Sequence, residues 1–237
     1  MPDRDPTLRL MTMNVNLSNR RADLILQAIE TEHPDVLLMV EVTPDLWQML
    51  PAEFLERFPY RATELDTGPF GIALVSRLPF EEHDIYHFGI YGRPAIAARI
   101  CPREPPAGQE PRCLHLLGMH PDPPITGIMA RSRDAQFEEV GEYLRDVHET
   151  RRVVMGDMNI TPWSPVMRDF LEQNRLKDSA LGHGIHPTWF SHSLMFGIPI
   201  DQILHGSGVV ILDRHVGPEI GSDHFPVTAD IALMPME

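Results

Sequence analysis

The chain has 237 residues, 43% of them apolar, and a formal net charge of −14. A chain of this length can bury roughly 70 to 75% of its unfolded surface, so we expect one domain over residues 1–237. The acidic balance opposes binding to long nucleic acid, because phosphate-backbone contacts depend on clustered Lys and Arg and the sequence has no basic run. No stretch reaches the roughly 18 apolar residues that span a bilayer, and the first residues lack the core of a signal peptide, so a soluble chain is predicted.

Hydrophobic periodicity predicts a chain of alternating strands and helices. In order, the pattern predicts a strand over residues 8–15, a helix over 20–32 capped by Ser18 or Asn19, a strand over 35–40, a helix over 44–58, and strands over 60–63, 71–76, 82–87, 95–100 and 113–119. After a helix over 130–148 come a strand over 153–155, a helix over 163–174 and strands over 200–204, 209–216 and 225–231. We found no internal repeat or low-complexity tract.

Polar side chains follow the first two strands at the point where each strand ends. Asn14 lies at the exit of the first strand, and Glu41 directly follows the nearly continuous apolar run over 35–40, which is typical of a strand covered on both faces. A carboxylate in this position is either solvated at the sheet edge or bound to a cation, and Glu41 alone favours solvation.

The middle of the chain offers a tentative phosphate ligand and a pair of cysteines. Arg93 lies in Tyr-Gly-Arg-Pro before a strand, where it could bind a phosphate, although a single loop arginine is more often only solvated. Cys101 and Cys113 flank a Pro-rich hairpin tip. A disulfide closing the hairpin is conceivable, but without an oxidising compartment two buried thiols are favoured.

His120 follows the strand over 113–119 and begins the run His-Pro-Asp-Pro-Pro. Three prolines within the next four residues stiffen this loop and hold the imidazole at little cost in entropy.

Gly-Asp-Met-Asn over 156–159 places two polar side chains after a short buried strand. Asp157 and Asn159 point to the same side if the extended backbone persists, so one ligand could contact both. A turn rich in Gly, Asp and Asn is the equally weighted alternative when the motif is taken alone. At later strand ends lie Asp201, Asp223 and His224.

Two further groups of residues carry weaker signals. His183, His186 and His192 lie in a glycine-containing loop, where solvated side chains are favoured over a zinc site. Trp163, Trp189 and Phe190 are candidates for a pocket near the sheet edge, but aromatic residues are more often plain core and we do not count these three as site residues.

The ordered set of strand-end motifs resembles the endonuclease/exonuclease/phosphatase superfamily over nearly the whole chain. The motifs are Thr-Met-Asn-Val-Asn, Met-Val-Glu-Val, Gly-Ile-Ala-Leu-Val-Ser-Arg-Leu-Pro, Gly-Asp-Met-Asn, Ile-Asp-Gln-Ile-Leu and Gly-Ser-Asp-His-Phe-Pro-Val. Each is weak alone, and together in this order they are specific. The resemblance implies a DNase I-like α/β fold: a four-layer sandwich of two packed mixed β-sheets flanked by helices, with the site at one edge.

The resemblance also implies a role for each residue of the site. Asn14, Glu41 and Asp223 would gather at a divalent cation, and oxygen ligands without thiolate agree with Mg²⁺ or Mn²⁺. Asp157 would orient or deprotonate the attacking water, and Asn159 would steady the phosphoryl group. His224, held by Asp201, would face the phosphorus. His120 would stabilise charge or protonate the leaving oxygen, in a Pro-rich setting that departs from the usual Thr-His-Leu or Asn-His-Leu.

We therefore predict a metal-dependent phosphoesterase that acts on a small phosphate ester, with diesters ranked above monoesters. A nuclease is the alternative within enzymes, and a non-catalytic binding module on the same fold is the alternative of another class. We expect a monomer, with the cytoplasm as the default location; a domain taken from a membrane-anchored protein of a similar bacterial subgroup is the other possibility.

Overall fold

The structure, a computed structural model, describes residues 7–102, 111–147, 150–184, 186–189 and 197–235. One six-stranded sheet contains β1 (Thr7–Asn14), β2 (Val36–Val40), β3 (Tyr60–Glu64), β4 (Ile72–Ser76), β11 (Val209–Val216) and β12 (Val227–Leu233). Its strand order is β11-β12-β1-β2-β4-β3, and only β1 and β2 run parallel among these pairs.

The second six-stranded sheet contains β5 (Phe80–Phe88), β6 (Arg93–Ile100), β7 (Leu114–Met119), β8 (Arg152–Asp157), β9 (Lys177–Asp178) and β10 (Asp201–His205). Its order is β5-β6-β7-β8-β10-β9, with β7 and β8 as the parallel pair. Both sheets are therefore mixed, and each has its parallel pair near the middle.

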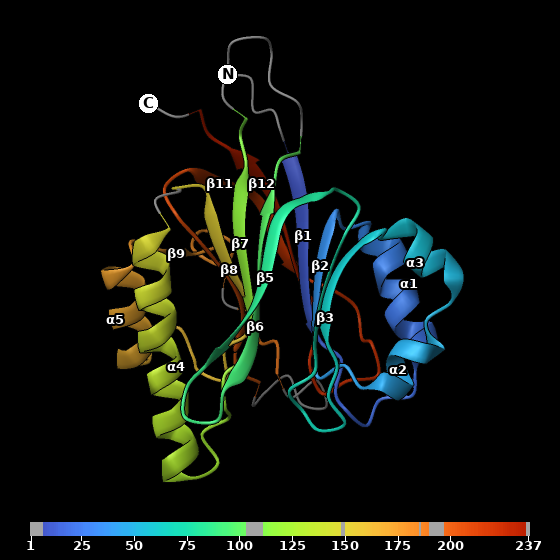
Figure 1. Cartoon of the computed structure of the whole chain (residues 1–237), viewed down its shortest axis with the longest axis horizontal. Coiled ribbons are helices and arrows are strands. Elements are labelled where there is room, and N and C mark those ends of the chain that lie inside the picture. The colour runs from blue at the N-terminus through green and yellow to red at the C-terminus, as the bar shows by residue number, and fades with distance from the viewer. Residues whose placement is uncertain (1–6, 103–110, 148–149, 185, 190–196, 236–237) are drawn as a thin grey trace.

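Helices cover the outer face of each sheet, which gives four layers (Figure 1). Beside the first sheet lie α1 (Ala22–Glu32), α2 (Pro44–Met49) and α3 (Ala52–Arg57); beside the second lie α4 (Gly127–Asp146) and α5 (Pro165–Gln173). The predicted four-layer α/β sandwich is confirmed. Within the described residues, no helix combines the length and the apolar content needed to cross a membrane.

Three apolar layers hold the sandwich together. Leu10, Leu38 and Met155 belong to the layer between the two sheets. The neighbouring positions Met11 and Leu37 point outward to the layer under α1, as the two-residue period of a strand requires. Because the central strands are covered on both faces, their sequences read as continuous apolar runs.

The parallel pairs decide where the functional side chains meet. Asn14 is in register with Val40 at the end of β2, and Gly118 of β7 is in register with Met155 of β8. The carboxyl ends of these four central strands lie at the same edge of the sandwich, the lower edge in Figure 1. Side chains that follow them can therefore share one site.

Two local expectations about helices are wrong. The segment 44–58 forms two short helices, because Pro51 has no backbone N–H to continue the first and instead precedes the second. The helix expected from residue 20 begins at Ala22, and its N-cap residue, Arg21, makes no side-chain cap. Asn19 accepts a hydrogen bond from the Arg21 backbone N–H instead, and so shapes the preceding turn.

The expectation of two free thiols is also wrong, because Cys101 and Cys113 form a disulfide. Ile100 of β6 is in register with Leu114 of β7, which puts the two cysteines directly opposite each other one residue beyond the paired strands. Their Cα atoms are 4.1 Å apart. Strand register, which composition does not reveal, brings the sulfurs together.

Candidate active site

Asp157 is the last residue of β8 and is 1% exposed. The residue before it, Gly156, has φ +147°, and a Cβ there would lie 1.9 Å from the carbonyl oxygen of Met119. Only glycine allows this close approach of β8 to the end of β7. Oδ1 of Asp157 accepts a hydrogen bond from the Asn159 backbone N–H at 2.9 Å, which fixes the carboxylate.

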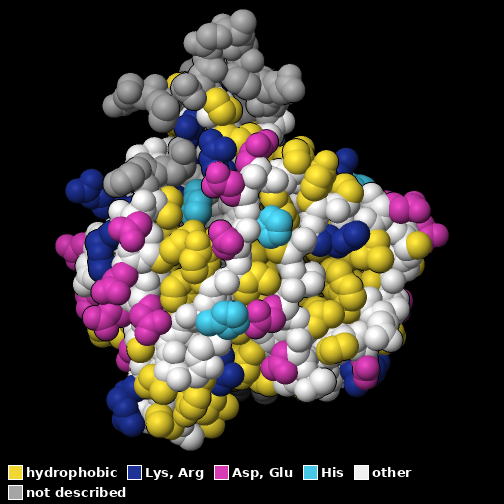
Figure 2. All heavy atoms as spheres, viewed as in Figure 1, with side chains coloured by type: hydrophobic (Ala, Val, Ile, Leu, Met, Phe, Trp, Pro, Cys, Tyr) yellow, Lys and Arg dark blue, Asp and Glu magenta, His cyan; other side chains and the backbone are white. Residues whose placement is uncertain are grey.

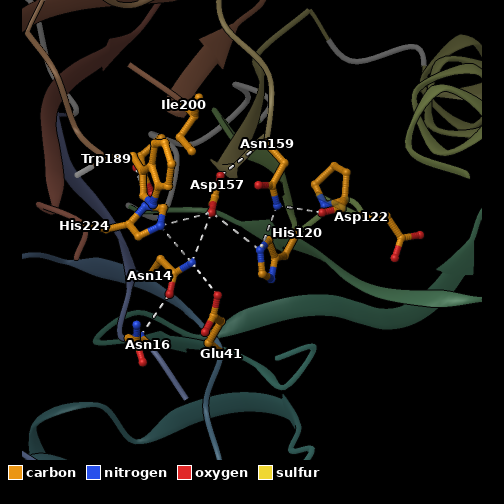
Figure 3. Close-up of polar contacts among 12 residues, drawn as sticks. Asn14, Asn16, Glu41, His120, Asp122, Asp157, Asn159, Trp189, Ile200 and His224 are labelled. Carbon is orange, nitrogen blue, oxygen red and sulfur yellow. Dashed lines mark hydrogen bonds and ion pairs between the residues drawn. The ribbon is translucent and has the colours of Figure 1, made fainter. Parts of the chain in front are cut away.

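His224 and Asp201 form a buried pair beside Asp157. Nδ1 of His224 lies 2.9 Å from Oδ2 of Asp201, and Nε2 of His224 lies 3.7 Å from Oδ2 of Asp157 (Figure 3). Asp201 is opposite Asp157 in the β8–β10 register, so strand pairing sets their separation. The Asp201 backbone N–H donates to Oγ1 of Thr188, and the His224 backbone N–H donates to Oγ of Ser222.

The charges of this group are set by competition between burial and neighbours. Burial would lower the pKa of His224, but the carboxylates of Asp201 and Asp157 outweigh it and raise that pKa to about 10. Burial would likewise raise the pKa of Asp157, yet the His224 and His120 imidazoles hold it at about 2. At neutral pH these shifts place an imidazolium beside an ionised carboxylate.

His120 approaches Asp157 from the other side. Its Nε2 lies 3.5 Å from Oδ2 of Asp157, and the negative charge of Asp157 raises the pKa of His120 against the opposing effect of burial. Asn159 fixes this loop, because its side-chain nitrogen donates to the Pro121 carbonyl at 2.9 Å and lies 3.2 Å from Nε2 of His120. Nδ1 of His120 is buried and has no hydrogen-bond partner among the described residues.

Asn14 links the two sheets at the site. Its side-chain nitrogen lies 2.8 Å from Oε1 of Glu41 and 3.0 Å from Oδ2 of Asp157, so it donates to a carboxylate from each sheet. Its oxygen accepts from the Asn16 backbone N–H at 2.9 Å. In this arrangement Asn14 orients the carboxylates, and its oxygen retains one lone pair for a ligand.

Glu41 and Asp223 lie on the cavity wall with Asn16 between them. Oδ1 of Asp223 accepts from the Asn16 side chain at 2.7 Å, and Oδ2 accepts from Nε1 of Trp189 at 3.0 Å. Oε2 of Glu41 accepts from the Leu17 backbone N–H at 2.9 Å. The structure thus brings Glu41 close to Asn14 but gives no contact between Glu41 and Asp223.

Three cavity residues have strained backbones. Asn16, Glu41 and Asn159 have φ values of 61°, 63° and 50°, in the left-handed region that residues other than glycine rarely adopt. Such strain costs on the order of 1–3 kcal/mol per residue and persists only where the surroundings impose it. All three occur just after a central strand, where the strain turns the side chain into the cavity.

The donor set fits a hard divalent cation. Glu41, Asp157, Asp201 and Asp223 supply four carboxyl groups beside two imidazoles, and burial raises the pKa of Asp201 against the opposing effect of His224. The nearby oxygens come from carboxylate and amide groups, with no thiolate, which is the chemistry that Mg²⁺ or Mn²⁺ requires. Among the described residues, Asp157, Asp201 and His224 also have ligand atoms within 4.8 Å of one another.

A cavity of about 600 Å³ opens onto these groups. Its wall includes Asn16, Glu41, His120, Asp157, Asn159, Asp223 and His224. Asn14 and Asp201 lie behind this wall and are 1% and 0% exposed, respectively. The structure therefore assembles eight of the nine predicted site residues in and directly behind one cavity.

Arg93 is the ninth residue, and it lies outside the cavity lining. Its Nε and NH2 atoms lie 2.8 and 2.7 Å from Oδ1 of Asp122, which is fully buried. Its guanidinium also stacks on the Phe70 ring, 3.3 Å from the centroid. Substrate binding by Arg93 stays a prediction. In the structure the charge of Arg93 is paired with the Asp122 carboxylate.

The remaining aromatic and histidine candidates differ in whether they line the cavity. Trp189 lines the cavity, whereas Trp163 is 54% exposed and does not. His183 and His186 lie in a loop away from the cavity lining. Phe190 and His192 are outside the described residues.

Asn16 is the residue that sequence reasoning missed. It lies two positions after Asn14 in the Thr-Met-Asn-Val-Asn motif, and an extended backbone would have placed both amides on one side. The chain instead turns at Asn16, and its side chain reaches Asp223 from the opposite end of the sequence. The alternation of the two asparagines was the available signal.

Comparison with known proteins gives one family match and several similar folds. The model of the Endonuclease/Exonuclease/phosphatase family matches residues 11–224. An endonuclease/exonuclease/phosphatase from Bacteroides vulgatus is 18% identical with a TM-score of 0.75, over 97% of this chain and 100% of that one. A search of curated proteins found no match.

Two further solved structures share the fold but differ in what they act on. A 3′ phosphatase from Neisseria bound to a product DNA hairpin is 21% identical with a TM-score of 0.69, over 94% of this chain and 98% of that one. Sphingomyelinase C from Streptomyces griseocarneus is 16% identical with a TM-score of 0.65, over 95% and 99% respectively. At these identities the similarity establishes the fold and leaves the substrate open.

Proposed function

The chain belongs to the Endonuclease/Exonuclease/phosphatase family, and on this premise we propose that it is a divalent-metal-dependent phosphodiesterase that uses in-line attack by water. The position of Asp157 carries the proposal. Its carboxylate is buried and ionised between two imidazoles and faces a cavity large enough for a small phosphate ester. This combination can accept a proton on one side of a phosphorus atom and stabilise charge on the other.

The chain's own residues divide the work of the reaction. Asp157 orients the attacking water and accepts its proton. The His224 imidazolium donates from Nε2 to a non-bridging phosphoryl oxygen, while Asp201 accepts from Nδ1 and fixes the orientation of the ring. His120 protonates the leaving oxygen from Nε2, and Asn159 holds the His120 loop in place.

We place the cation on the side of Glu41, with Asp223 and Asn14 as its other ligands. A bound divalent cation supplies positive charge to the phosphoryl oxygens as negative charge builds on them. Glu41 supports this placement, because it is half-buried at the cavity wall and its carboxylate accepts hydrogen bonds from the Asn14 amide and the Leu17 backbone N–H. In the group of Asp157, Asp201 and His224, the protonated imidazole of His224 already supplies a positive charge beside the two carboxylates.

The charge of the site favours a diester over a monoester. A phosphodiester carries one negative charge, whereas a monoester carries nearly two at neutral pH and adds to an acidic surrounding. Arg133 is the one Lys or Arg that lines the described cavity, and it is already paired with Asp134 at 2.8 Å. On the face shown in Figure 2, Lys and Arg are scattered among acidic side chains, which also disfavours long nucleic acid.

The proposal is tested with bis-(p-nitrophenyl) phosphate and p-nitrophenyl phosphate after chelation and readdition of single metals. We expect nitrophenol release from the diester, dependent on Mg²⁺ or Mn²⁺, at a higher kcat/KM than from the monoester. Asp157→Asn removes the base, and Asp169→Asn on the surface of α5 is its matched control. Equal activity of the Asp157→Asn variant, or a preference for the monoester, would contradict the proposal.

A further inference from the structure

The catalytic cavity has two chemically distinct halves. Polar groups line it around Asp157 and Glu41, and we call the set of apolar side chains in its lining the apolar half. We infer that the apolar half binds an aliphatic chain esterified to the substrate's phosphate, so that the substrate is an alkyl phosphodiester with one phosphate. This inference rests on the proposed function, whose site it extends.

The apolar half is built from separate segments that meet at the cavity. Its wall includes Phe70, Pro124, Ile125, Ile160, Ile198 and Ile200. Ile160 and Ile200 are 6% and 5% exposed and form the floor, whereas Ile125 is 77% exposed at the rim. Figure 3 shows Ile200 and Trp189 beside Asp157 and His224, on the side away from Glu41. A group attached to a phosphate at Asp157 can therefore reach the apolar wall directly.

This wall is held rigid on the Phe70 side. The Phe70 ring packs 5.8 Å from the His120 ring, and Arg93 stacks on it and on Tyr91, 5.1 Å from the Tyr91 centroid. Asp122 neutralises Arg93 behind the ring. Aliphatic and proline side chains dominate the remaining wall, which suits a flexible chain without polar groups.

The charges around the cavity limit the rest of the substrate. A second phosphate would need an unpaired cation, and the single Arg133 of the lining donates to Asp134 and to the Asn159 carbonyl. Ile125 and Ile128, which is 46% exposed, continue the apolar surface from the cavity mouth onto the start of α4. A molecule with one phosphate and an apolar chain matches this arrangement of a polar site followed by an apolar surface at the cavity mouth.

The inference is tested with a series of alkyl p-nitrophenyl phosphates that carry methyl, butyl and octyl chains, all as monomers. Charge and leaving group stay constant, so only the chain changes. Each methylene that enters the cavity should raise kcat/KM by about two- to fourfold, or roughly 8- to 60-fold for the three methylenes between methyl and butyl. Saturating Mg²⁺ or Mn²⁺ is present throughout.

Two variants separate the wall from general effects on the enzyme. Ile125→Ser should flatten the dependence of kcat/KM on chain length while the variant stays folded, because the exposed side chain contributes little to folding. Leu181→Ser is the matched control, since Leu181 is 70% exposed and outside the cavity lining. It should leave the chain-length dependence unchanged. Ile198→Ser, checked by melting temperature, repeats the test at a second apolar residue of the lining.

The outcomes distinguish this inference from the proposed function. Metal-dependent hydrolysis with equal kcat/KM for all three chains would overturn the inference and leave the phosphodiesterase in place. Failure to hydrolyse any member with any divalent cation would overturn the proposed function itself. If kcat/KM is independent of chain length and Ile125→Ser leaves it so, this result also contradicts the apolar subsite.

A second arm identifies the source of the alkyl ester. The octyl ester is offered as a monomer and then in vesicles of zwitterionic phosphatidylcholine, because a chain of net charge −14 is repelled by an anionic surface. Faster hydrolysis in vesicles assigns the substrate to a lipid surface. Slower hydrolysis there assigns it to a free amphiphile.

Discussion

The two sheets contribute to the site in different ways. The second sheet provides Asp157 and Asp201 from within paired strands, and both are essentially unexposed. The first sheet provides Glu41 from a left-handed turn after β2, half-buried and bonded mainly to Asn14 and a backbone N–H. Strand pairing gives the precision that proton transfer needs, whereas a carboxylate at a turn can adjust to a cation and its exchange with solvent.

The largest expected effect concerns the cation that we assign to Glu41, the carboxylate at the turn: chelation should abolish turnover. Four carboxyl groups meet at the site, and the phosphoryl group brings further negative charge that a cation would offset. We expect activity at background with chelator and full recovery with Mg²⁺ or Mn²⁺, measured by nitrophenol release. The melting temperature should change by only a few degrees, because three apolar layers hold the fold. Undiminished turnover in chelator would remove the cation from the mechanism.

The second effect concerns Asp201, which lies in a paired strand, and its partner His224. Asp201→Ala and His224→Ala should each lower kcat by about 10²- to 10⁴-fold, because the 2.9 Å bond makes the two side chains one device. The double variant should be scarcely worse than the worse single variant. Losses that multiply would show two independent roles. Circular dichroism of each variant separates lost function from lost folding.

The third effect concerns affinity for the cation. Glu41→Gln should raise the metal concentration for half-maximal activity by roughly 10- to 100-fold and change kcat at saturating metal much less. Glu64→Gln is the control, because Glu64 is partly exposed and pairs with His87 away from the cavity. If Mn²⁺ titration instead shows the loss in Asp201→Asn and not in Glu41→Gln, the cation belongs to the Asp157, Asp201 and His224 group.

The sequence predicts which residues reach the site better than how they contact one another, for a physical reason. A buried strand is a continuous apolar run, and a polar residue at its end must lie at the sheet edge, which identified Asp157 and Glu41 without coordinates. The contacts between these residues depend on register and on which sheet each strand joins. Neither follows from local pattern, so the role of Asn14 as a donor to both carboxylates became visible only in the structure.

Local backbone geometry explains the other differences. The contact of Asn16 with Asp223 depends on the left-handed φ of Asn16, which a strand pattern does not reveal. The Cys101–Cys113 disulfide depends on the β6–β7 register, and the break at Pro51 depends on one missing donor within a helical pattern. The four-layer order itself was predicted only through the resemblance to a known family.

The smallest expected effect on turnover comes from Arg93, the tentative phosphate ligand. The Arg93 guanidinium already forms an ion pair with Asp122. Asp122 is buried and outside the cavity lining, and its Oδ2 has no hydrogen-bond partner among the described residues. Arg93→Gln leaves this carboxylate buried without its cation, so we expect the free energy of unfolding to fall by about 3–5 kcal/mol. At a temperature where the variant is folded, kcat/KM for the methyl ester should stay within about threefold. Arg93→Gln combined with Asp122→Asn should regain much of the stability, because the pair is then neutral, with denaturant unfolding as the measurement. A loss of kcat/KM of a hundredfold in the folded single variant, not regained in the double, would instead show that Arg93 contacts the substrate.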